Sequence, residues 1–298
     1  DNYKAENPNA TISFEVYDAS QYYTALSTAL QSGDMPDLFT SHGSKNASLL
    51  QYINAGAVVD LTPYFSEEVL SVFDEYLLQR AKVGGKLYMT PGSFLDTWPI
   101  FYNKQIFADN GLEVPNTWDE LINIMDTLTE NGITAMSFPG KDVKGPATYI
   151  MNINHCINPD WVDDMVNYRF DQEPSGKLSD SRHANGCEEF LRWIEAGYFG
   201  PDWKGLDMNG GILEFTSGKS AMWWRGSYDK NAIAANEEIE VGAFYPPTKD
   251  GKRSLISGQD CASGFSIYSQ TPDFDFALDA LKFICSAEQM QIIADAGQ

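Results

Sequence analysis

The stretch Pro115–Phe138 (PNTWDELINIMDTLTENGITAMSF) carries the clearest local structural signals in the sequence. Thr117 can cap the free amides at the start of a helix, and Glu120, three residues later, completes a capping box. Apolar residues then recur at helical spacing as far as Gly132, which ends the helix. The apolar run that follows predicts a strand over Ile133–Phe138. A helix leading directly into a buried strand is typical of an α/β fold.

The same alternation extends over the rest of the chain. Further strands are predicted at Thr11–Tyr17, Pro36–Phe39, Leu87–Thr90, Trp98–Tyr102, Ser220–Trp224, Glu240–Phe244 and Gly264–Tyr268. Further helices are predicted at Gln21–Gln31, Ser44–Asn54, Ser66–Arg80, Tyr149–Cys156, Pro159–Tyr168, Ser181–Glu195, Phe274–Cys285 and Ala287–Asp295. Strands that alternate with helices favour largely parallel sheets with helices on both faces, and such sheets bind ligands beyond the carboxyl ends of their strands.

Composition limits the possible functions of the chain. It has 298 residues, a length that predicts two domains or one large one, and 43% of them are apolar, too many for a disordered chain. With 42 Asp and Glu against 20 Lys and Arg, the net charge of −22 argues against nucleic acid or an anionic membrane surface as a partner. No apolar run is long enough to span a membrane, and no basic, apolar signal segment opens the sequence.

The cysteines and histidines do not indicate a disulfide scaffold or a clear metal site. The four cysteines are scattered and none lies in a CxxC pair, so they do not fix the redox compartment. His155, Cys156, His183 and Cys187 allow a zinc site, but buried thiols and surface histidines are the simpler interpretation. We therefore expect neither a metal nor a cofactor.

Catalytic motifs are missing from the sequence. Gly218-Lys219-Ser220 does not form a phosphate loop, because Leu213 stands where the pattern requires glycine. No GxGxxG, GxSxG or HExxH occurs, and the three histidines are isolated from one another. A carboxylate pair of a glycoside hydrolase stays open as an alternative, because the chain has so many acids. The favoured interpretation is a protein that is not an enzyme.

Aromatic residues beside polar ones at the ends of predicted strands suggest a sugar site. They occur in Asp96-Thr97-Trp98, in Trp223–Tyr228 and near Gln259-Asp260. Sugars present an apolar face for aromatic rings and a rim of hydroxyls for Asp, Asn, Gln and Arg. The alternative is that most of these rings belong to the core, and of the adjacent Trp223 and Trp224 at least one is expected there.

A series of phrases resembles, in the same order, the family-1 extracellular solute-binding proteins of ABC sugar importers, the group that includes maltose-binding protein. The phrases are Glu6-Asn7-Pro8-Asn9, Ser32-Gly33-Asp34-Met35-Pro36-Asp37, Gly85-Lys86-Leu87-Tyr88, Tyr102-Asn103-Lys104, Pro115-Asn116-Thr117-Trp118-Asp119-Glu120-Leu121, Phe215–Met222, Gly226-Ser227-Tyr228 and Lys282-Phe283-Ile284. Most of them are scaffold signatures, such as caps and turns, and do not indicate which sugar is bound.

This resemblance implies an α/β, two-lobed periplasmic-binding-protein-like fold of type II, each lobe a mostly parallel sheet flanked by helices, with the ligand in a cleft between them. Lobe one is expected at residues 1–94 plus 248–285 and lobe two at 97–244, with the hinge near 92–98 and 245–247. Residues 286–298 are expected to begin C-terminal helices that return to lobe two. Complete members have more chain at both ends, so we expect a fragment of a longer protein.

The implied function is extracellular binding of a sugar or oligosaccharide and its delivery, chemically unchanged, to an ABC transporter membrane permease. The implied ligand-binding residues are His42, Asp96, Trp98, Tyr149, Trp224, Arg225, Tyr228 and Asp260. The protein is expected to be a monomer without a nucleic-acid partner, either a lipoprotein on the outer face of a Gram-positive membrane or a periplasmic protein. A secreted glycoside hydrolase and a same-fold binder of a non-sugar solute, such as a peptide, polyamine or metal, are the alternatives.

Overall fold

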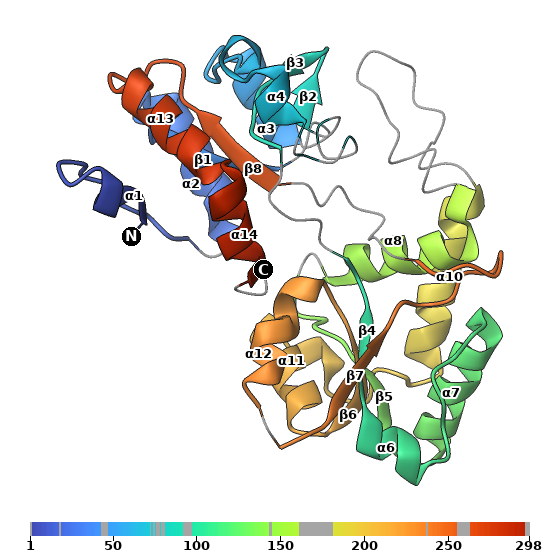
Figure 1. Ribbon diagram of the computed structural model, residues 1–298. Coiled ribbons are helices and arrows are strands. Elements are labelled where there is room, and N and C mark those ends of the chain that lie inside the picture. The colour runs from blue at the N-terminus through green and yellow to red at the C-terminus, as the bar shows by residue number, and fades with distance from the viewer. Residues whose placement is uncertain are drawn as a thin grey trace. The chain divides into compact units, whose positions relative to one another are not determined.

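The chain forms two compact units, and each is described here by itself. The computed structural model describes residues 2–17, 19–42, 47–71, 73, 75, 78, 81–91, 97–142, 145–160, 181–236, 238–254 and 263–295. Unit 1 comprises Asp1–Leu95 and Asp260–Gln298, and unit 2 comprises Asp96–Gln259 (Figure 1). The chain therefore leaves unit 1 once and returns to it once.

The units and the expected lobes assign two segments differently. Residues 248–259 belong to unit 2 and residues 286–298 to unit 1, whereas the expected lobes place them the other way round. Arg253 accounts for the first assignment, because its Nη1 donates to the carbonyl oxygen of Pro115 at 2.7 Å. Met290 of the last helix packs against the core of unit 1, which accounts for the second. The lobe boundaries themselves stay a prediction.

In unit 1, a strand from the N-terminal segment pairs with a strand from the C-terminal segment. Its elements are α1 (Asn2–Glu6), α2 (Ala19–Ser32), β1 (Leu38–His42), α3 (Ala47–Asn54), η1 (Thr62–Tyr64), α4 (Glu67–Leu70), β2 (Lys82–Val83), β3 (Lys86–Leu87), β8 (Ser263–Ile267), α13 (Phe274–Ile284) and α14 (Ala287–Asp295). β1 pairs antiparallel with β8, from Leu38 opposite Ile267 to His42 opposite Ser263. The N-terminal α1 is held against α13, where the Tyr3 hydroxyl donates to Asp279 Oδ2 at 2.7 Å.

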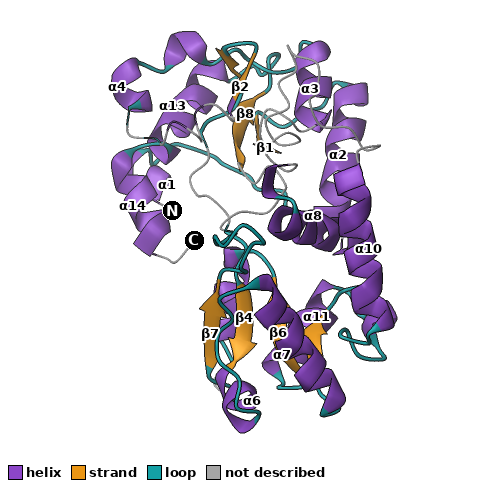
Figure 2. Cartoon of the chain, turned by 90° about the vertical axis from the view of Figure 1, so that its right-hand side faces the viewer, coloured by secondary structure: helices purple, strands orange, loops and turns teal. Residues whose placement is uncertain are grey.

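Unit 2 is built on a four-stranded sheet in the order β5-β6-β4-β7. Its elements are β4 (Ile100–Asn103), α6 (Lys104–Asp109), α7 (Trp118–Glu130), β5 (Thr134–Ser137), α8 (Gly145–Ile157), α10 (Ser181–Glu195), η2 (Trp203–Gly205), α11 (Met208–Thr216), β6 (Ser220–Trp224), η3 (Ser227–Asp229), α12 (Lys230–Ala234) and β7 (Val241–Phe244). Figure 2 shows β7 and β4 next to each other, beside α7.

The expectation of mostly parallel sheets is wrong for the strand pairs that the structure describes. In unit 2 only β5 and β6 run parallel, and β4 pairs antiparallel with both β6 and β7. The reason lies in the path of the chain: β4 follows the entry into unit 2 and β7 precedes the exit, so these neighbours run in opposite directions. β5 and β6 can be parallel because helices connect them.

Helices cover both faces of the unit 2 sheet. Trp224 and Met222 of β6 point to the larger core, where α7, α8 and α10 pack. Trp223, between them, points to the other face and packs with Phe215 of α11 and Ile233 of α12. Figure 1 shows α7 and α10 on one side of the sheet and α11 and α12 on the other. Alternate residues of β6 are therefore buried on opposite faces, as the pleat of a strand requires.

The expected elements are largely present. The predicted bounds of α10, β6 and α14 are confirmed, and Thr117 caps α7 by accepting the Glu120 amide at 3.2 Å. The predicted strand Thr11–Tyr17 is wrong, since this segment forms no strand and leaves Phe14 82% and Val16 92% exposed. Alternation alone did not suffice, because a strand also needs a partner that accepts its backbone hydrogen bonds. The predicted helix Pro159–Tyr168 lies mostly outside the described residues.

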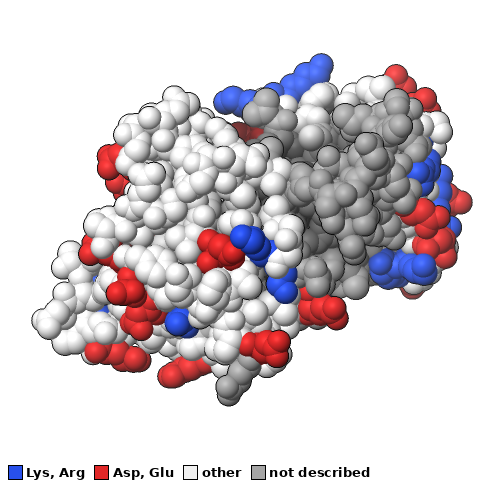
Figure 3. Space-filling model, turned by 90° about the horizontal axis from the view of Figure 1, so that it is seen from above, with Lys and Arg blue, Asp and Glu red and all other residues white. Residues whose placement is uncertain are grey.

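On the face that Figure 3 shows, acidic and basic side chains lie in small groups that are separated by uncharged residues.

No helix in the described part of the chain is both long and apolar enough to cross a membrane.

Glu214 of α11 generates a test of how burial affects stability. Burial raises the pKa of this carboxyl, with a further contribution from Asp202, and its Oε2 has no hydrogen-bond partner among the described residues. The folded protein therefore holds this proton more tightly than the unfolded chain, and stability falls as the pH rises through the titration. We expect Glu214→Gln to raise the melting temperature at pH 7 by about 1–2 °C, and this gain to shrink at about pH 4.

Thermal melts of both proteins at the two pH values measure this effect. Glu130→Gln is the matched control, because Glu130 is exposed at the end of α7 and pays no comparable burial cost. A Glu214→Gln protein that is less stable than the native one at both pH values would contradict the explanation.

Candidate functional site

Five side chains of unit 2 gather where β6 ends and where the chain enters β4. We call them the aromatic–arginine cluster: Trp98, Trp223, Arg225, Tyr228 and Asp229. β6 and β4 place them, because Ile100 pairs with Trp224 and Phe101 with Trp223 in the antiparallel register. That pairing sets the residues before β4 opposite the residues after β6.

Hydrogen bonds hold these two segments together beyond the sheet. The Ser227 amide donates to the Thr97 carbonyl oxygen at 2.8 Å, and the Thr97 amide donates to Ser227 Oγ at 3.3 Å. Trp224 Nε1 donates to the carbonyl oxygen of Trp98 at 3.2 Å. These three hydrogen bonds therefore fix the backbone around the cluster. They join segments that are far apart in the sequence, since Thr97 and Ser227 are separated by 130 residues.

Arg225 is the centre of the cluster. Its guanidinium carbon lies 5.2 Å from the ring centre of Trp98, 5.5 Å from that of Tyr228 and 6.0 Å from that of Trp223. All three distances are within the range of cation–π attraction. Only 12% of the side chain is exposed. A nearly buried cation surrounded by rings is costly unless something charged or polar faces it.

Asp229 supplies part of that compensation. Its Oδ2 lies 3.7 Å from Arg225 Nε, which is an ion pair but too long for a hydrogen bond. The same oxygen accepts a hydrogen bond from Trp223 Nε1 at 2.9 Å. Burial raises the pKa of the Asp229 carboxyl, while the bond from Trp223 and the charge of Arg225 act in the opposite direction. The carboxylate therefore orients both Trp223 and Arg225.

Tyr228 is the exposed ring of the cluster. It is 43% exposed, while Trp98 is only 5% exposed. The two rings meet edge to face, with centres 6.2 Å apart and planes at 87°. Gly226 leaves room for the Tyr228 ring, because a Cβ at position 226 would lie 2.2 Å from Tyr228 Cε1. The result is an accessible aromatic ring whose orientation is set by its neighbours.

The residues expected in the site divide into three groups. Trp98, Arg225 and Tyr228 are brought together in the cluster. Asp96 and Asp260 lie outside the described residues, as does the side chain of His42, the last residue of β1 in unit 1. The structure therefore gives no geometry for these three side chains.

Tyr149 and Trp224 form the third group and are part of the core. Each is 1% exposed, and their ring centres lie 5.8 Å apart. The Tyr149 hydroxyl donates to the Ser137 carbonyl oxygen at 3.0 Å, and burial raises its pKa. Both side chains face the large apolar core because α8 and β6 pack there. In this arrangement the two side chains pack inside the core next to the cluster and are too buried to contact a ligand.

Two members of the cluster were not expected from the sequence. Asp229 was missed, although its spacing of four residues from Arg225 is a signal for an ion pair. Trp223 lies in the stretch Trp223–Tyr228 that suggested a sugar site, but it was not among the implied ligand-binding residues, and it is 1% exposed. Its indole nitrogen nevertheless holds Asp229 in place, a contact that no sequence pattern indicates.

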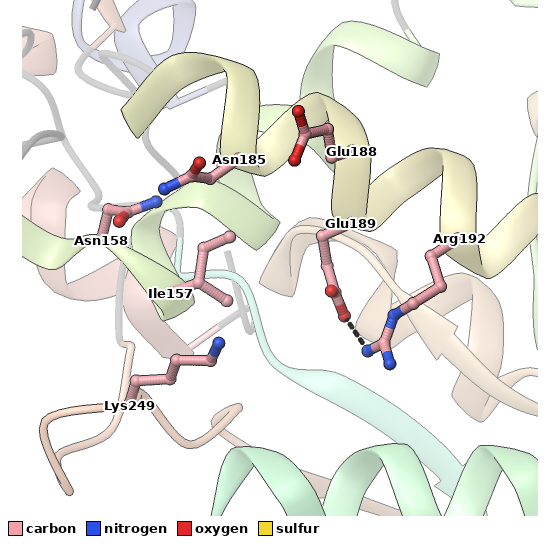
Figure 4. Close-up of a pocket in the computed structure, with 7 residues that line it drawn as sticks. All are labelled: Ile157, Asn158, Asn185, Glu188, Glu189, Arg192 and Lys249. Atoms are coloured by element: carbon pink, nitrogen blue, oxygen red, sulfur yellow. Dashed lines mark hydrogen bonds and ion pairs between the residues drawn. The ribbon is translucent and has the colours of Figure 1, made fainter. Parts of the chain in front are cut away.

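A second feature of unit 2 is an open polar pocket of about 330 Å³ between α8 and α10 (Figure 4). It is lined by Ile157, Asn158, Asn185, Glu188, Glu189, Arg192 and Lys249. Glu189 is occupied by Arg192, whose Nη2 lies 2.5 Å from its Oε1, and by Trp193 Nε1 at 3.0 Å. The described residues that line this pocket include no aromatic ring, so the pocket lacks a stacking surface for a sugar.

Two of the possible zinc ligands, His155 and Cys156, have surroundings that the structure describes. Cys156 is buried, and burial raises its pKa, so the thiol form is favoured. His155 Nδ1 lies 3.1 Å from Ser254 Oγ. Within the described ranges, no group of three or more His, Cys, Asp or Glu side chains is arranged to hold a metal ion.

Known proteins similar to this chain share its fold. The solved structure from work on xylan utilization by Caldanaerobius polysaccharolyticus superposes with a TM-score of 0.83 at 21% identity, covering 95% of this chain and 72% of the other. The SBP RafE in complex with raffinose superposes with a TM-score of 0.76 at 24% identity, covering 99% and 75%. At such identities the superpositions establish the α/β fold of periplasmic sugar-binding proteins.

Sequence comparison extends over the same length. The Multiple sugar-binding protein of Streptococcus mutans is 26% identical over 297 residues, which are 97% of this chain and 67% of that protein. The chain thus spans about two thirds of that relative's length. The sequence model of the family described as Bacterial extracellular solute-binding protein matches residues 1–291. This chain therefore belongs to the bacterial extracellular solute-binding protein family.

Proposed function

We propose that this protein binds a sugar or oligosaccharide outside the cell and delivers it to the membrane permease of an ABC importer. Membership of a solute-binding family means that the role is binding and not catalysis. The relatives point to the ligand class: one is a multiple sugar-binding protein, and one solved structure holds raffinose. The protein acts as a monomer, either as a lipoprotein on the extracellular face of a Gram-positive cell membrane or free in the periplasm.

We further propose that the aromatic–arginine cluster forms part of the ligand surface. The observation that carries this proposal is the accessible ring of Tyr228, held edge to face against Trp98 and beside the Arg225 guanidinium. A ring can stack on the apolar face of a sugar, and a guanidinium can bond its hydroxyls. Stacking adds about 0.5–1.5 kcal/mol beyond the area that it buries. His42, Asp96 and Asp260 stay predictions as further contacts.

The first test is a titration calorimetry panel of xylotriose, raffinose, chitobiose and their monosaccharides. At least one of them is expected to release or absorb heat and to raise the melting temperature, since a ligand that binds only the folded state stabilises it. Prolonged incubation should return the sugar intact. Absence of heat and of a melting shift for every sugar would refute the sugar assignment, and cleavage of a labelled oligosaccharide would favour a hydrolase.

Tyr228→Ala tests the proposed stacking. Losing the ring should weaken binding of the sugar about tenfold or more, because stacking and the apolar contact together exceed about 1.4 kcal/mol. The protein should still fold, since Tyr228 is 43% exposed. Leu191→Ala is the control, because it removes a 54% exposed apolar side chain from α10 of the same unit. Equal affinity of the Tyr228→Ala and native proteins, measured by calorimetry, would remove Tyr228 from the site.

Gly226→Ala tests whether the orientation of that ring matters. The added methyl group would overlap the Tyr228 ring and displace it without deleting it. Affinity should fall about as far as in Tyr228→Ala, with little change in melting temperature. Gly205→Ala is the matched control, because a Cβ at position 205 meets no atom within 4 Å. Unchanged binding by Gly226→Ala, with Gly205→Ala also unchanged, would contradict the proposed orientation.

A further inference from the structure

The polar atoms of the aromatic–arginine cluster for which the described residues supply no hydrogen-bond partner are all donors. Within the part of the chain that the structure describes, Trp98 Nε1 and Arg225 Nε are buried and have no hydrogen-bond partner. Among the described residues, neither terminal nitrogen of Arg225 makes a hydrogen bond, and its one ion pair uses Nε. The side chain of Trp98, with 5% exposure, cannot satisfy its nitrogen by turning toward open solvent.

A surface with donors to spare favours a ligand that offers only acceptors. A sugar hydroxyl both donates and accepts, so a site that offers only donors uses just part of its hydrogen-bonding capacity. A carboxylate only accepts, and the two terminal nitrogens of a guanidinium match its two oxygens. Asp229 does not occupy that fork, because it approaches Arg225 at Nε and is bonded by Trp223.

We propose, as an extension of the sugar-binding function, that Arg225 binds the carboxylate of a uronic acid, so that the protein prefers an acidic oligosaccharide to its neutral counterpart. Tyr228, the exposed ring beside Arg225, stacks on the same or the adjoining sugar ring. The rings around Arg225 exclude water from the guanidinium, which strengthens a charge-assisted hydrogen bond.

The net charge of −22 does not prevent this binding. Exposed charges more than about 8 Å away are largely screened at physiological ionic strength. The local field is set by Arg225, and Asp229 is its one ion-pair partner in the described part of the chain. The acidic surface slows the approach of an anion but leaves the contact at the fork intact.

Calorimetry with two matched ligand pairs tests the preference. One pair is trigalacturonic acid and its methyl ester, and the other is xylotriose with and without a glucuronic acid branch. In at least one pair the acidic member should bind about tenfold or more tightly. Equal or weaker binding of the acidic member in both pairs would overturn the proposal.

The outcomes separate this inference from the function on which it rests. If neutral sugars bind as tightly as acidic ones, or more tightly, the uronic acid inference is overturned and the sugar-binding function stands. If no sugar of either kind binds, both are overturned.

Arg225→Lys identifies the residue responsible. Lysine keeps the positive charge beside Asp229 but loses the planar fork, so most of the preference for the acid should disappear. Lys104→Gln is the control for net charge, because Lys104 pairs with Glu240 at an exposed position and lies outside the cluster. A preference retained in Arg225→Lys, or lost equally in Lys104→Gln, would overturn the assignment. Should Arg225→Lys fail to fold, as melting would reveal, the affinities of the native protein for the two ligand pairs decide.

Discussion

The junction between the start of β4 and the turn after β6 holds the candidate site in place. It consists of the antiparallel register of Ile100 with Trp224 and of the bonds between Thr97 and Ser227 and between Trp224 and the Trp98 carbonyl. Every member of the aromatic–arginine cluster lies within five residues of this junction in the chain. The geometry of the cluster therefore depends on a sheet, and sites built on regular elements are better fixed than sites on free loops.

This arrangement has a cost in stability. A buried donor without a partner destabilises the folded state by about 1–3 kcal/mol, and Trp98 Nε1 and Arg225 Nε have no hydrogen-bond partner among the residues that the structure describes. Attraction between Arg225 and its rings offsets part of it, at about 0.5–2 kcal/mol for each cation–π contact. Packing in the adjacent core, which includes Trp193, Trp224 and Tyr149, offsets the remaining free-energy cost. A binding surface that keeps unpaired donors is thus possible because a large aromatic core lies beneath it.

The sequence predicted those features that depend on local interactions. α7 was found from its capping residue, and α10 and β6 from their patterns, because caps and periodicity act within a few residues. Thr11–Tyr17 was mispredicted as a strand, since pairing depends on residues far away in the chain. For the same reason Trp98 and Arg225 could be proposed one by one, but their contact follows only from the β4–β6 register.

The division between core and surface along β6 explains why Tyr149 and Trp224 were taken for ligand contacts and Asp229 was missed. Within the strand, Trp223 and Trp224 point to opposite faces, and helices bury both. Along this segment, exposed surface begins only after the strand ends, with 12% of the Arg225 side chain and 43% of Tyr228 exposed. Aromatic residues occur in both regions, so aromatic content alone does not separate the core from the proposed ligand surface, which begins after the last paired residue of β6. Tyr228 can therefore be exchanged with little effect on the core, whereas Trp224 cannot, because its indole also bonds the segment that carries Trp98.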